Sequence, residues 1–119
     1  MVSFDKFIAL ADNDDEFLLQ LLNQSLSDYV ALNDQYHKLV KLRDTDKLSR
    51  IIHKIKSTMI LLGLIELEAT LKSHSAMLVN TTTDESIDEI TVQISKSLNQ
   101  VIAEIQSKMN EISLLPKMI

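Results

Sequence analysis

The chain of 119 residues is long enough for one apolar core, and it contains no cysteine or tryptophan, one glycine and one proline. These counts exclude disulfides, zinc–thiolate sites and thiol nucleophiles, and they argue against a β-rich fold with many turns. The formal net charge of −5 argues against general nucleic-acid binding, and no apolar stretch is long enough for a membrane span. We expect one domain over residues 1–119, and a cytoplasmic location because the N-terminus lacks the features of a secretory signal.

Amphipathic helices are predicted along the chain, because apolar residues recur at three- and four-residue steps. A short leading helix is expected over residues 3–11, and the next over residues 14–42. Asn13 is the expected N-cap of this second helix, and Glu16 completes a capping box. The inner side of the leading helix carries Phe4, Phe7, Ile8 and Ala11. The apolar stripe of the second helix comprises Phe17, Leu18, Leu21, Leu22, Leu26, Tyr29, Val30, Leu32, Tyr36, Leu39 and Val40.

The third helix is expected over residues 46–62, after a polar turn at residues 43–46 that supplies its N-cap. Gly63 is expected just past its end, because glycine adopts a left-handed backbone without steric strain. It is the only glycine of the chain, so the end of this helix is well specified.

A fourth helix is expected over residues 64–78, followed by a polar loop at residues 80–84. Ser86 and Glu89 form a capping box for the last helix, which Pro116 ends. The stripe of this helix comprises Ile87, Ile90, Ile94, Leu98, Val101, Ile105, Met109 and Ile112. Short connections between long amphipathic helices favour an all-α fold, an antiparallel up-down four-helix bundle with a short extra N-terminal helix.

The chain has three histidines, the residues with the clearest chemistry near neutral pH. Nothing in the sequence distinguishes His37 and His74 from incidental surface or edge histidines. No Glu-x-x-His or His-Glu-x-x-His motif is present, and the inward stripes are almost wholly apolar, so we expect no metal site and no ligand site in the core.

His53 differs because its helix has a clear outward face. The inward stripe of that helix comprises Leu48, Ile51, Ile52, Ile55, Met59 and Leu62, and the outward one comprises Arg50, His53, Lys56, Ser57 and Ile60. A histidine that faces solvent has a free ring nitrogen that can act as a nucleophile. Lys56, one turn along, can support the charge of a phosphoryl group, and Ser57 is small enough to leave the ring accessible. Ile60 is an exposed apolar residue on the same stripe.

Positive charge is concentrated around this histidine. Residues 41–56 hold six of the twelve basic residues of the chain, including Arg50 and Lys54, against only two aspartates. A basic surface of this kind suits an acidic partner and speeds encounter with it. We therefore expect Arg50, Lys54 and Ile60 to contact a partner.

The segment from His53 to Gly63 resembles the signature of histidine-containing phosphotransfer (HPt) domains. That signature has a histidine, any residue, an aliphatic, a lysine, a small residue and then Ser, Thr or Ala, and it ends with an aliphatic and a glycine. The matching residues are His53, Ile55, Lys56, Ser57, Thr58, Leu62 and Gly63. The segment departs from the family pattern at Ser57, where glycine is common, at Leu61, where a polar residue is common, and at Leu64, where alanine is usual.

The resemblance implies that His53 accepts a phosphoryl group from the aspartate of a receiver domain and passes it to another receiver. The partners would be receiver domains of response regulators or hybrid histidine kinases, which supply Mg²⁺. The chain itself would need no cofactor and would not be an enzyme in its own right. We expect a monomer, because one histidine face and one bundle core account for the patterning of the sequence.

Two alternatives stand beside a ligand- or metal-binding bundle, against which the apolar inward stripes argue. A histidine-kinase dimerisation domain usually has an acidic residue after its histidine and a proline a little later, where this chain has Lys54 and Thr58. A non-catalytic bundle that binds a receiver without accepting phosphate is the second alternative, and the intact pair of His53 and Lys56 counts against it.

Overall fold

The computed structural model describes residues 2–79 and 84–114, and these residues form five α-helices and no strand. The helices are α1 (Asp5–Ala11), α2 (Asp15–Lys41), α3 (Thr45–Leu61), α4 (Ile65–Val79) and α5 (Asp84–Leu114). The predicted all-α fold, with one short helix before four longer ones, is confirmed. Over the described residues, no helix combines the length and the apolar character that a membrane crossing requires.

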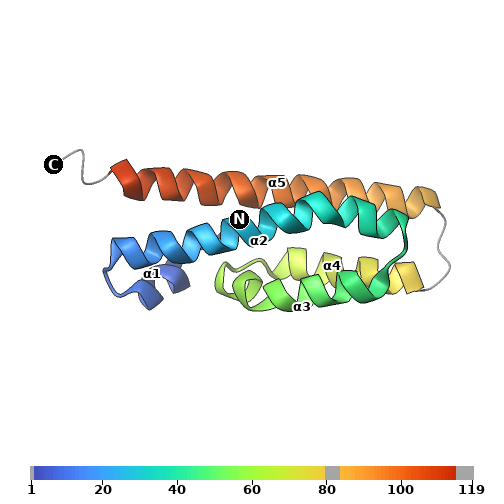
Figure 1. Ribbon diagram of the computed structural model, residues 1–119, viewed down its shortest axis with the longest axis horizontal. Helices are drawn as coiled ribbons and strands as arrows, with labels where there is room; N and C mark the ends of the chain where they lie inside the picture. The colour runs from blue at the N-terminus through green and yellow to red at the C-terminus, as the bar shows by residue number, and fades with distance from the viewer. Residues whose placement is uncertain (1, 80–83, 115–119) are drawn as a thin grey trace.

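The helices lie side by side along the long axis of a molecule that measures 57 × 21 × 20 Å (Figure 1). Helices α2 and α5 are the longest and contact each other over most of this length. Helix α3 packs against α2 and α4, and α4 packs against α3 and α5, while α1 folds back onto α2. The main neighbours of α3 therefore lie on two of its sides, which leaves an outward face.

The core is built from the predicted stripes. In α5, six of the eight predicted stripe residues are buried and the other two, Ile90 and Met109, are partly buried against the core. Three residues assigned to inner faces are instead exposed: Ile8 at 41%, Phe17 at 41% and Val30 at 38%. Ile8 and Val30 follow the buried Phe7 and Tyr29, and consecutive residues point about 100° apart around a helix, so the exposed member of each pair is turned away from the core. Phe17 lies in the first turn of α2 and precedes the buried Leu18, so it is turned away from the core in the same manner.

The prediction that Asn13 caps α2 is wrong, and Asp14 is the N-cap. The carboxylate of Asp14 accepts a hydrogen bond from the backbone N–H of Phe17 at 3.1 Å, while Asn13 adopts a left-handed backbone with φ of 69° in the turn before it. Asp44 caps α3 in the same way, accepting from the N–H of Lys47 at 3.2 Å. The second, third and fourth helices otherwise begin and end within one residue of their predicted bounds.

Two other predicted helix starts are wrong. Helix α1 begins at Asp5 rather than residue 3, because the N–H of Ser3 donates to the carbonyl of Leu62 at 2.9 Å, a contact distant in sequence. Helix α5 begins at Asp84, so Ser86 lies inside it rather than at its cap. A capping box marks a possible start but does not stop a helix from extending further. The predicted loop residues 80–83 and the predicted stop at Pro116 lie outside the described residues.

Candidate functional site

His53 lies in the middle of α3 with its side chain exposed. The opposite face of the helix is buried through Leu48, Ile55 and Met59, so helical geometry turns the imidazole toward solvent. His53 lines a shallow depression together with Asp46, Ser49 and Arg50. The structure therefore leaves the ring accessible to a partner, as the outward stripe predicts.

The other predicted site residues share this face, with one difference. Arg50, Lys54 and Ser57 are exposed, and Ile60 is 48% exposed. Lys56 is only half-exposed, because its side chain leans toward α4, where its Nζ lies 3.9 Å from Oε1 of Glu68. The same oxygen lies 3.6 Å from Nζ of Lys72, four residues further along α4. The charge-supporting lysine therefore has a carboxylate partner in the resting protein.

The buried side of α3 is anchored to α2 next to the site. The hydroxyl of Thr58 donates to the carbonyl of Ile55 at 2.8 Å, so the hydroxyl of Tyr29, 3.3 Å away, is the donor in their contact. Tyr29 has no exposed surface, and burial raises the pKa of its hydroxyl to about 12, so the group stays protonated. This contact fixes α3 one turn beyond His53.

Gly63 ends α3 as predicted, with a left-handed backbone at φ of 71°. The N–H of Gly63 donates to the carbonyl of Ile60 at 3.1 Å, and the N–H of Leu64 donates to the carbonyl of Met59 at 2.9 Å. These two bonds form a Schellman motif, and Leu64 and Met59, which they join, are both buried. The turn places α4, and with it Glu68, alongside α3.

His74 is not the incidental surface or edge histidine that the sequence predicts. It is fully buried, and its Nδ1 forms a hydrogen bond with the hydroxyl of Tyr36 from α2. Burial lowers the pKa of His74, and the backbone carbonyl of Ile87 acts in the opposite direction. The signal for burial was present in the sequence, because His74 continues the inward stripe of Leu71 and Leu78 at helical spacing.

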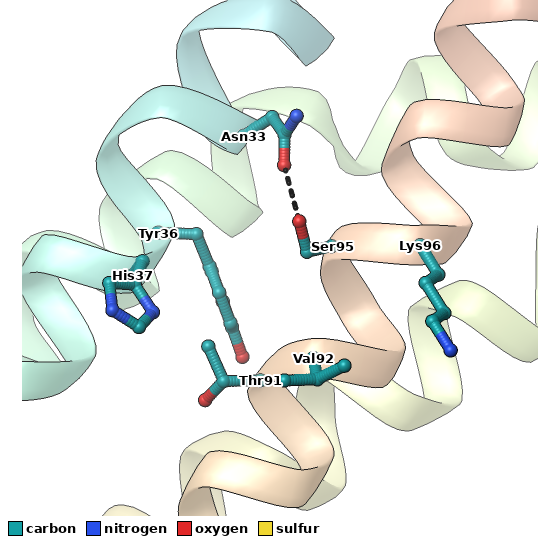
Figure 2. Close-up of a pocket in the computed structure, with 7 residues that line it drawn as sticks. All are labelled: Asn33, Tyr36, His37, Thr91, Val92, Ser95 and Lys96. Carbon is teal, nitrogen blue, oxygen red and sulfur yellow. Dashed lines mark hydrogen bonds between the residues drawn. The ribbon is translucent and has the colours of Figure 1, made fainter.

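His37 is exposed on α2 and lines a cleft between α2 and α5 (Figure 2). Tyr36 and Thr91 also line this cleft, and the hydroxyl of Ser95 donates to Oδ1 of Asn33 across it at 3.4 Å. Within the described residues, no group of three or more His, Cys, Asp or Glu could hold a metal ion. The cleft lies at the seam of α2 and α5, so it is separate from the face of α3 that carries His53.

No family model matches the chain, and no curated protein or solved structure is significantly similar to it. Any assignment of the site therefore depends on the residues and on their geometry.

Proposed function

We propose that the chain is a phosphotransfer module of the HPt type, an antiparallel up-down four-helix bundle with α1 as an extra helix, in which His53 is the phosphoryl acceptor. The observation that carries the proposal is the exposed imidazole in the middle of a well-anchored helix, within the ordered set of residues from His53 to Gly63. An exposed surface histidine is common, but this combination with Lys56 one turn along and a glycine-terminated helix is not.

Phosphorylated His53 would be a covalent intermediate, so that the transfer of a phosphoryl group between two receivers occurs in two steps. A ring nitrogen of His53 attacks the phosphorus of an aspartyl phosphate on a receiver domain; the N–P bond forms, the acyl P–O bond breaks, and the carboxylate leaves while the ring proton passes to solvent. The reverse step returns the group to the aspartate of a second receiver. Such transfers need positioning and charge stabilisation, for which the receiver supplies Mg²⁺ and this chain supplies the nucleophile and the Lys56 ammonium.

The surface around His53 supports an acidic partner. Arg50 and Lys54 are exposed beside it, and Ile60 adds apolar area on the same stripe. We propose that these residues contact receiver domains of response regulators or hybrid kinases, which carry carboxylates around their own phosphorylation site. The module would act as a monomer in the cytoplasm, and it would not be an enzyme in its own right.

The test is transfer of an acid-labile label from a ³²P-phosphorylated receiver to the protein. We expect wild type and His37→Gln to take up label and His53→Gln to take up none, because only His53 combines exposure with the surrounding signature. A wild-type protein that binds receivers but never becomes labelled would replace this proposal with the non-catalytic adaptor. Label that persists in His53→Gln would refute the assignment of the acceptor.

A further inference from the structure

The strongest unexplained feature of the site is Glu68, a carboxylate shared between two lysines. Its Oε1 lies 3.9 Å from Nζ of Lys56 and 3.6 Å from Nζ of Lys72. The Glu68 side chain is only 18% exposed, whereas those of Lys56 and Lys72 are 45% and 64% exposed. Because a partly buried carboxylate is costly to leave without a partner, Glu68 requires at least one of the two lysines.

The two lysines differ in what else they can reach. Lys72 lies on α4, one turn after Glu68 on the same helix, so its pairing is local. Lys56 lies on α3, one turn after His53 on the outward stripe, so its ammonium can pair with Glu68 or turn toward a phosphoryl group on the imidazole. If Lys56 leaves Glu68, Lys72 still satisfies the carboxylate, which lowers the cost of the movement.

We infer that Glu68 is a positioning residue that controls how strongly Lys56 supports the phosphoryl group on His53. This inference rests on the proposed function, since it concerns the same acceptor. In the resting protein Glu68 holds Lys56 and neutralises it; when His53 carries a dianionic phosphoryl group, Lys56 is divided between two anions. Glu68 thus weakens the stabilisation of phosphohistidine and keeps the group ready for transfer.

The test uses phosphoramidate, a small donor that needs no receiver. A ring nitrogen of His53 attacks its phosphorus, the N–P bond of the reagent breaks, and ammonia leaves with the ring proton as ammonium. Hydrolysis then reverses the modification: water attacks the phosphorus, and inorganic phosphate and the free imidazole are restored. ³¹P NMR follows both the rate of modification and the lifetime of phosphohistidine.

The key variant is Glu68→Gln, which keeps the shape and removes the charge. We expect it to be phosphorylated faster than wild type and to hold the group longer, each by about two- to fivefold, the range for a partly exposed ion pair. Glu66→Gln is the matched control, because Glu66 is exposed on the same helix and carries the same charge. Thermal unfolding of each variant shows whether the fold is retained.

The same substitution is also made in the Lys56→Gln variant. This separates an effect that acts through Lys56 from a general effect of the lost negative charge. In Lys56→Gln, the further change Glu68→Gln should have no effect, because no ammonium remains to be released. The inference is overturned if Glu68→Gln behaves like Glu66→Gln, if its effect persists in Lys56→Gln, or if phosphoramidate leaves His53 of wild type unmodified. A different outcome decides the proposed function. If Glu68→Gln has its expected effect but no phosphoryl group passes from His53 to a receiver, the proposed function fails and the inference about Glu68 stands.

Discussion

Acid should destabilise this protein through His74, a titratable side chain buried in the core. His74 has no exposed surface, and its Nε2 has no hydrogen-bond partner among the described residues. Tyr36 faces it from α2, and the carbonyl of Ile87 faces it from α5. Ser25 and Thr91, the other buried polar residues in the described part of the chain, carry no charge, and the two groups that face His74 are neutral.

The sign and size of the effect follow from linkage. Burial lowers the pKa of His74 in the folded protein below its ordinary value of 6.5, so the unfolded chain binds the proton more readily. Stability from the neutral ring is therefore present in full above about pH 6.5 and is lost as the pH falls below it. If the ring stays neutral in the folded protein at pH 5.0, the free energy of unfolding falls by about 2 kcal/mol between pH 7.5 and pH 5.0. This is the largest decrease that one histidine can cause over this range.

The assay is urea unfolding at pH 7.5 and pH 5.0, followed by circular dichroism. The best variant is the double change Tyr36→Phe with His74→Leu, because replacing both hydrogen-bond partners by apolar groups leaves no buried polar atom unpaired. We expect the double variant to lose less stability than wild type between the two pH values, with a difference of up to about 2 kcal/mol. His37→Gln, a change at an exposed histidine, should keep the wild-type pH dependence. Equal losses in the double variant and in wild type would refute the reasoning.

Two further predictions concern the face that carries the site. Gly63→Ala should destabilise the protein by about 1–2 kcal/mol, measured by urea unfolding, because alanine is strained at φ of 71°. The atom nearest to an added Cβ is Cβ of Ser3 at 3.4 Å, which causes no clash, so the loss would come from the backbone alone. An unchanged stability would contradict this argument. Ile60→Ser should change stability by less than about 0.5 kcal/mol, because Ile60 is half-exposed. It should also weaken receiver binding, measured by calorimetry. Unaltered binding would show that Ile60 does not contact the receiver.

Much of the architecture around His53 was predictable because it is local. The inward stripe of α3 requires only the 3.6-residue period, which turns His53 away from the core. The position of Gly63 follows from its backbone freedom, and the cap of α3 in the polar turn at residues 43–46 follows from a side-chain hydrogen bond to a nearby N–H group. Asn13 shows the limit of such rules, since two adjacent residues can both cap and only the turn geometry selects Asp14.

The remaining features required the tertiary structure, because they join residues that no local rule connects. The partner of Lys56 lies across the α3–α4 turn at Glu68, and the support of α3 comes from Tyr29, which is 29 residues from Thr58. His74 fits the spacing of a core residue, but its polarity argued for the surface until the hydroxyl of Tyr36 supplied its partner. The sequence by itself determined which faces of the helices are apolar and that His53 points outward; only the packing of the helices decided which polar side chains meet, since that depends on the relative positions of helices far apart along the chain.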